Sequence, residues 1–182
     1  MTVAWTTELH DQLDWHWQHH VRPRLDGITD EEYFWQPVPD CWTVRPRAEK
    51  PEGPGSGDFT VDFAFPEPVP PPVTTIAWRL AHVIVGVLGM RAASHFGGPA
   101  MSYETFPYAG TAAEALDQLD SAYASWIGGV KALDADALAR AVGPAEGPFA
   151  EYPMAALVLH INRETIHHCA EVLLLRDLYR SR

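Results

Sequence analysis

The spacing of hydrophobic residues along the chain predicts four long helices. In the first, Leu9, Leu13 and Trp17 recur at intervals of four residues, which places them on one face of a helix that Pro23 ends. Threonines suited to cap a helix precede the second and third helices, and Pro153 precedes the fourth. The expected helices cover about residues 6–21, 75–96, 111–130 and 154–180.

A long irregular region, residues 26–73, separates the first helix from the second. We expect a short helix from Asp30, an exposed loop over the Pro- and Gly-rich residues 50–58, and a short extended segment within residues 59–65. A connection of this length in a compact domain usually has a function or forms part of an interface. The prediction is an all-α fold: a single four-helix-bundle domain over residues 1–182, with a long irregular connection between helices 1 and 2.

The composition favours a folded domain without a nucleic-acid partner. A chain of 182 residues, 47% of them hydrophobic, can bury a sizeable core. Its 13 Lys and Arg are scattered among 24 Asp and Glu, which gives a net charge of -11 and leaves no basic face to meet phosphate groups. We therefore expect no direct binding to DNA or RNA.

Neither a signal peptide nor a membrane span is expected. Residues 1–18 lack a basic segment followed by an apolar one. The longest apolar stretch, residues 76–90, is interrupted by Arg79 and His82 and is too short to cross a bilayer. The two cysteines, Cys41 and Cys169, suggest neither a disulfide framework nor a zinc ribbon, and Cys169 is expected to be a packing residue. A cytoplasmic protein is the expectation.

The strongest chemical feature lies on the fourth helix, where Glu164 and His168 are four residues apart. Side chains at this spacing stack on one helical face, and a carboxylate with a neutral imidazole is a ligand pair for zinc, nickel or iron. His82 is the natural third ligand, because it lies among apolar residues of the second helix and a buried histidine needs a polar partner. The sequence thus predicts a divalent-metal site inside the bundle.

The same residues have a second explanation. Glu164 could instead neutralise an imidazole within a hydrogen-bonded core network that holds no metal. His160 is too far from His168 along the helix to share an ion with it, so it would support Glu164. His16 and His160 are candidates for moving protons. The chain has no motif of a hydrolase elbow, nucleotide-binding loop or zincin, so its catalytic residues are otherwise unassigned.

Several segments resemble the DinB-like (DinB/YfiT) family in its actinobacterial form: residues 13–17, 22–25, 29–35, 78–82, 162–172 and 175–179. The resemblance covers nearly the whole chain and implies a four-helix bundle, often a homodimer, with a divalent ion held by the second and last helices. Thiol-dependent S-transferases and the mycothiol-dependent maleylpyruvate isomerase belong to this family. Their His, Glu, His ligands correspond to His82, Glu164 and His168. The resemblance therefore implies a metal-dependent S-transferase or isomerase that uses a low-molecular-weight thiol on a small-molecule substrate.

One departure from the family pattern favours a different interpretation. Many members have His-x-x-x-His on the last helix. If His167 is the counterpart of the final histidine, the residue four positions earlier is Arg163, which cannot bind a metal. In that register the chain would be a non-enzymatic, small-molecule-binding or stress-associated bundle protein with a degraded metal site. Whether the protein is an enzyme thus depends on which histidine faces His82.

Overall fold

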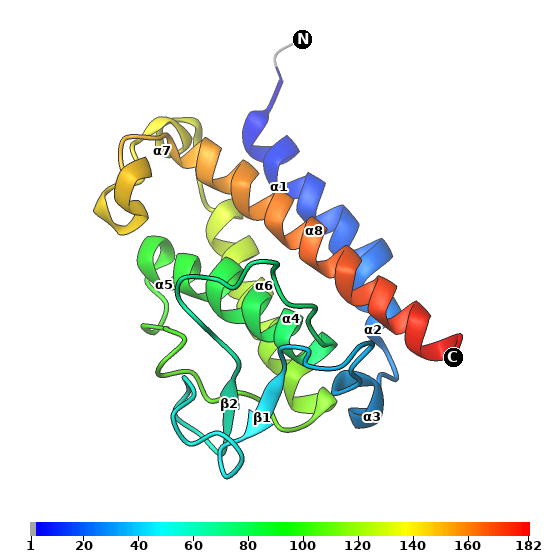
Figure 1. The fold of residues 1–182 in the computed structure, drawn as a ribbon. Coiled ribbons are helices and arrows are strands. Elements are labelled where there is room, and N and C mark those ends of the chain that lie inside the picture. The colour runs from blue at the N-terminus through cyan, green and yellow to red at the C-terminus, as the bar shows by residue number, and fades with distance from the viewer. Residues whose placement is uncertain (1–2) are drawn as a thin grey trace.

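Four long helical segments pack together in the computed structural model, which describes residues 3–182 (Figure 1). The first two segments are each interrupted by a π-helical stretch, whereas the third and fourth are continuous α-helices. The segments are α1 (Trp5–His16), η1 (Trp17–Val21) and α2 (Arg22–Leu25); α4 (Ile76–His82), η2 (Val83–Gly89) and α5 (Met90–Phe96); α6 (Ala112–Lys131); and α8 (Met154–Arg180). The predicted all-α fold is confirmed.

The remaining elements are short and lie in the connections. Between α2 and α4 the chain forms α3 (Asp30–Tyr33), β1 (Val44–Pro46) and β2 (Phe59–Val61). Between α6 and α8 it forms α7 (Ala135–Ala139) and the 3-10 helix η3 (Pro144–Phe149). The two strands pair antiparallel, with Val44 opposite Val61. The extended segment expected within residues 59–65 is therefore present in its first three residues, but its partner strand was not predicted.

The segment from Ile76 to Phe96 is the central helix of the fold. Its elements contact both α6 and α8, and its apolar side chains Leu80 and Leu88 are fully buried. By length and composition it could cross a membrane, but 61% of its most apolar window is buried inside the protein, as in the core helix of a bundle. The cap predicted at its start is present, because the Thr75 side chain accepts a hydrogen bond from the backbone N–H of Trp78.

The prediction that Pro23 ends the first helix is wrong. The helix passes through Pro23 and ends at Leu25. Directly before the proline, the chain forms the π-helical turn η1, in which the Arg22 N–H bonds to the carbonyl of Trp17, five residues back. This wider turn accommodates the proline, which has no N–H and would clash with a carbonyl in a regular α-helix.

The long connection is held by polar side chains rather than by a core of its own. Asp62 is buried and accepts hydrogen bonds from the Thr43 N–H and from the side chains of Arg45 and Lys50. The Arg47 guanidinium donates to carbonyls of residues 51, 53, 55, 57 and 59, so the predicted loop at residues 50–58 is tied down at many points. Trp78 holds the connection beside the first turn of α4, because its indole N–H donates to the Asp62 carbonyl at 2.7 Å.

Candidate metal site

His82 and His168 meet where α4 packs against α8. Their ring centroids are 4.7 Å apart and their planes stand at 85°. Glu164 lies on the same face of α8, with a carboxylate oxygen 3.5 Å from Nε2 of His168. The side chain of His168 is only 12% exposed, whereas those of His167 and Arg163 are 64% and 68% exposed. The register is therefore the one in which Glu164 and His168, and not Arg163 and His167, face His82.

His168 has a second carboxylate neighbour, Glu171, on the other side of its ring. Nδ1 of His168 lies 2.8 Å from a carboxylate oxygen of Glu171. Glu164 lies beside Nε2 and Glu171 lies beside Nδ1, so each ring nitrogen of His168 has a carboxylate next to it. A carboxylate behind a histidine is a common way to orient a metal ligand. Glu171 was not among the residues predicted from the sequence, although its spacing of three residues from His168 places both on one helical face.

His82 is positioned by side-chain contacts with Tyr103 and Trp78. Nδ1 lies 2.7 Å from the Tyr103 hydroxyl, and the ring stacks on Trp78 with centroids 5.4 Å apart. Gly86, one turn further along, makes room for this contact, because a Cβ there would overlap the Tyr103 hydroxyl. Tyr103 lies in an irregular segment between α5 and α6, where no periodic pattern could have indicated it.

The contact between His82 and Tyr103 joins two groups that burial keeps uncharged. Burial, followed by the nearby His168 and Arg79, lowers the pKa of His82 to about 4, while Glu164 and Glu171 oppose the shift. Burial also raises the pKa of Tyr103 to about 12. At neutral pH the His82 imidazole is therefore uncharged, which is the form that binds metal ions.

Arg79 brings a positive charge to one side of the site. Its Nε lies 3.1 Å from a carboxylate oxygen of Glu171, and a terminal nitrogen lies 3.3 Å from Nδ1 of His168. Its guanidinium also sits over the Trp78 ring, and burial lowers its pKa. Arg79 thus compensates the charge of Glu171 and holds that carboxylate behind His168.

A second grouping of possible ligands uses the opposite nitrogen of His168. Ligand atoms of His167, His168 and Glu171 all lie within 4.8 Å of one another. An ion there would have to replace the Arg79 contacts to Glu171 and to Nδ1 of His168, and it would recruit the exposed His167. On the Nε2 side, His168 faces Glu164 and His82. Among the described residues, only the grouping of His167, His168 and Glu171 meets that spacing; the predicted set of His82, Glu164 and His168 shares His168 with it and would leave the Arg79 contacts in place.

Comparison with known families agrees with this architecture. A model of the DinB superfamily matches residues 12–172. The chain belongs to the DinB superfamily. The match spans most of the chain of this DinB-superfamily protein. It includes His82, Glu164, His168 and Glu171, which together form the histidine cluster. No curated protein and no solved structure matches the chain. A closer relation to actinobacterial members or to mycothiol-dependent isomerases stays a prediction.

The two proton-transfer candidates of this DinB-superfamily protein lie in different places. His160 is beside the site: its Nδ1 is 3.5 Å from a Glu164 carboxylate oxygen and accepts a hydrogen bond from Arg163 at 2.7 Å. His16 is on α1, where its ring neighbour is His20 at 5.6 Å. Burial and then His20 lower the pKa of His16. The structure therefore brings His160, but not His16, to the edge of the cluster.

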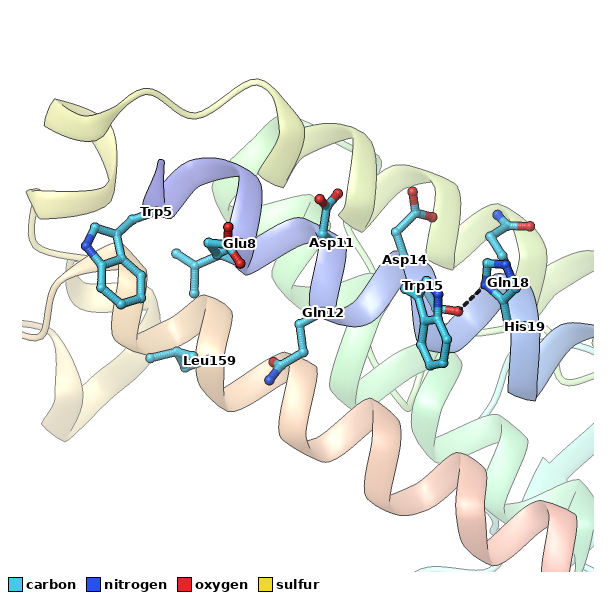
Figure 2. Close-up of a pocket in the computed structure, with 10 residues that line it drawn as sticks. Trp5, Glu8, Asp11, Gln12, Asp14, Trp15, Gln18, His19 and Leu159 are labelled. Atoms are coloured by element: carbon cyan, nitrogen blue, oxygen red, sulfur yellow. Dashed lines mark hydrogen bonds between the residues drawn. The ribbon is translucent and has the colours of Figure 1, made fainter. Parts of the chain in front are cut away.

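A separate groove lies along α1 of the DinB-superfamily protein, and Leu159 of α8 also lines it (Figure 2). It has a volume of about 830 Å³ and shares no lining residue with the histidine cluster. Trp5 and Leu159 lie at one end of the groove, and Trp15 and His19 lie at the other. Its acidic lining residues come from α1 and are Glu8, Asp11 and Asp14. The groove offers no histidine pair with a carboxylate like that of the cluster, so it has the character of a surface for contacts rather than of a metal site.

Proposed function

We propose that this DinB-superfamily protein binds one divalent metal ion, with His82, Glu164 and His168 as ligands. The carrying observation is the arrangement around His168, whose Nδ1 lies 2.8 Å from Glu171, whose Nε2 lies 3.5 Å from Glu164 and whose ring meets that of His82. Two imidazoles and a carboxylate suit zinc, nickel or iron. For Nε2 of His82 to bind the ion, Nδ1 keeps its proton and donates it to the Tyr103 hydroxyl.

We further propose that the protein is a cytoplasmic S-transferase or isomerase that uses a low-molecular-weight thiol such as mycothiol. An ion with three protein ligands keeps an open position, where it would lower the pKa of a bound thiol so that the thiolate forms at neutral pH. The chain's own thiols are unsuited to this role. Cys41 and Cys169 are both 1% exposed, and burial raises the pKa of Cys169 to about 12. The thiol would therefore come from a small molecule, and His160 is the group best placed to move a proton.

Metal analysis of protein purified without a His-tag tests the proposal. After removal of metal with a chelator and reloading with zinc or nickel, we expect about one ion per chain and a rise in melting temperature. The variant His168→Ala should lose the ion, whereas His167→Ala, which changes the exposed neighbour, should retain it. Binding of less than a tenth of an equivalent by the parent protein would overturn the proposal, and loss of the ion in His167→Ala would point to the grouping with Glu171.

A non-enzymatic binding protein with a degraded metal site is the second candidate. The observation that favours it is Arg79, a cation in contact with both His168 and Glu171. In this case the imidazoles and carboxylates form a hydrogen-bonded network, and zinc should leave the melting temperature unchanged. Glu164→Ala and His168→Ala should then alter stability by similar amounts with and without the metal. A stabilisation of about 2.7 kcal/mol at a zinc concentration 100 times Kd would exclude it.

A further inference from the structure

A cavity of about 670 Å³ opens beside the candidate metal site, between α5, the η3 region and the first turns of α8. Its volume falls in the range of small-molecule sites. Two contacts connect it to the metal site. On α8, His160 lines the cavity and lies 3.5 Å from Glu164. On the central helix, Arg91 lines the cavity and donates to the carbonyl of Gly86, the glycine that lies against Tyr103.

One wall of the cavity is apolar and accessible. Phe149 and Tyr152 are each 56% exposed, and their rings pack edge to face with centroids 5.6 Å apart. Met90, Val142 and Leu157 continue this wall. Aromatic surface left exposed beside a cavity is typical of sites that cover the hydrophobic body of a ligand.

The opposite edge of the cavity offers hydrogen-bond donors. The Arg163 guanidinium donates to Nδ1 of His160 at 2.7 Å. Because a guanidinium has no acceptor, Nδ1 of His160 must be unprotonated, and the proton lies on Nε2. Arg163 and His160 therefore both present N–H donors at this edge, and Arg163 adds a full positive charge that is 68% exposed.

Among the charged groups that line the cavity, Arg163 is the one least compensated by a neighbour. The acidic lining residue, Glu146, is already paired: its carboxylate lies 3.4 Å from Arg91 and 2.9 Å from Nε2 of His95. Glu164 lies 3.4 Å from Arg163, but the Arg163 side chain is 68% exposed, so solvent weakens this ion pair with or without a metal on Glu164. The result is a local positive charge in a chain whose net charge is -11. Such a charge favours an anion at this edge.

We propose that the cavity binds a small organic acid, with its hydrophobic body against Phe149 and Tyr152 and its carboxylate at Arg163 and His160. The planar guanidinium suits a carboxylate, which accepts two parallel hydrogen bonds from it. The role of this acid as the substrate rests on the metal-dependent function proposed above, whereas its binding to the cavity does not. The substrate class is then a hydrophobic carboxylic acid.

The matched probes 2-naphthoate and 2-naphthamide test this assignment, because they share a ring system and differ in charge. Calorimetric titration of the full chain, both metal-stripped and zinc-loaded, should give a Kd at least tenfold lower for the naphthoate. Arg163→Gln should remove that preference, and Tyr152→Ala should weaken the binding of both probes. Arg140→Gln is the control, because Arg140 is exposed and lies outside the cavity. Circular dichroism verifies that each variant is folded.

Three results would overturn the assignment: equal affinity for the two probes, a preference for naphthoate that survives Arg163→Gln, or no binding of either probe at millimolar concentration. A preference that survives Arg163→Gln only in the zinc-loaded protein would indicate that the carboxylate binds the metal directly. Failure of the metal proposal gives a different result, in which the protein retains no zinc but still prefers the naphthoate. If only the cavity assignment fails, zinc is retained and the preference is absent.

Discussion

Tyr103 and Glu171 hold the two histidines of the candidate site through the nitrogens that face away from it. Tyr103 contacts Nδ1 of His82 at 2.7 Å, and Glu171 contacts Nδ1 of His168 at 2.8 Å. Such partners fix which nitrogen carries the proton and how the ring is oriented, and their loss typically lowers metal affinity about 10–100-fold. The contribution of these two residues can therefore be measured separately from that of the ligands.

Replacing Tyr103 by Phe should lower the zinc affinity about tenfold or more. The substitution keeps the ring that stacks on Phe63 and removes the hydroxyl that meets His82. Competition with a chromophoric chelator measures the change. Tyr152→Phe is the matched control, because it removes the hydroxyl of an exposed tyrosine. Unchanged zinc affinity in Tyr103→Phe would show that the hydroxyl does not orient His82.

Cys169 should be inert in the folded protein even though it follows His168 in the sequence. It is fully buried in the core, and burial raises the pKa of its thiol to about 12. At pH 7 roughly one thiol in 10⁵ is then ionised, so a disulfide reagent should react at the rate of unfolding. We expect slow labelling in native buffer and immediate labelling in denaturant, with Cys41→Ser used to isolate the signal. Rapid labelling of one thiol in the native protein would contradict the expected burial.

Residue spacing was sufficient to place Glu164 and His168 on one face of α8, because residues four apart on a helix always share a face. It could not decide whether that face or the one with His167 meets His82, since this depends on how α8 is rotated against α4. Tyr103 and Arg79 could not be assigned from the sequence for another reason. Tyr103 comes from an irregular segment, and the role of Arg79 depends on its contacts with a helix about 90 residues away.

At the scale of elements, the π-helical stretch η2 follows His82 directly. The hydrophobic spacing predicted a helix through residues 75–96, and this is correct, but it could not distinguish a π turn from an α turn. Such turns are frequent at functional sites. Within η2, Gly86 lets the Tyr103 hydroxyl come close to the helix backbone. The local geometry of the central helix and the contact with His82 are therefore linked.

Replacing Gly86 by Ala should displace Tyr103 and reproduce the zinc-affinity loss of Tyr103→Phe. The two substitutions should not be additive in the double variant, because they remove the same contact. Gly128→Ala on α6 is the control, since a Cβ there meets nothing within 4 Å. In that helix interior the change should stabilise the fold by about 0.5–1 kcal/mol. Full additivity of the losses in zinc affinity would show that Gly86 and Tyr103 act through different contacts.

The short helix α3 is attached to α8 by a buried ion pair. Glu32 and Arg176 are both 3% exposed at their side chains and lie 2.8 Å apart. Glu32→Ala leaves the guanidinium without its carboxylate and should lower the free energy of unfolding by about 3–5 kcal/mol. Urea denaturation measures this. Glu31→Ala, on the exposed side of α3, should change the stability by less than about 0.5 kcal/mol. Similar effects of the two substitutions would argue against the buried pair.

At the scale of the whole molecule, the helices were predictable and the connection between them was not. The helices follow from an apolar stripe that repeats with the helical period, and their main departure, the passage through Pro23, is a local change of turn. The connection depends on single polar side chains, Asp62 and Arg47, that bond to groups many residues away. No short-range pattern encodes such bonds, so its path could only be described as irregular.

We predict that the protein is a homodimer and that the groove along α1 forms its interface. Trp5 and Trp15 line this groove and are 67% and 58% exposed, which is unusual for tryptophan on a monomer surface (Figure 2). Sedimentation velocity should show a dimer at tens of micromolar, and Trp15→Glu should shift it to monomer. Phe65→Glu is the control, because Phe65 is 92% exposed but lies in the long connection.

The charge of the groove predicts how this dimer should respond to salt. Its exposed acidic lining residues Glu8 and Asp11 would approach their copies across a twofold axis, in a chain that already carries a net charge of -11, whereas Asp14 is paired with Lys131. Salt screens this repulsion between exposed like charges while leaving apolar contacts in place. The dimer should therefore become tighter between 50 and 500 mM NaCl. A dimer that dissociates over this range would instead be held by ion pairs, and a parent protein that is monomeric throughout would rule out this interface.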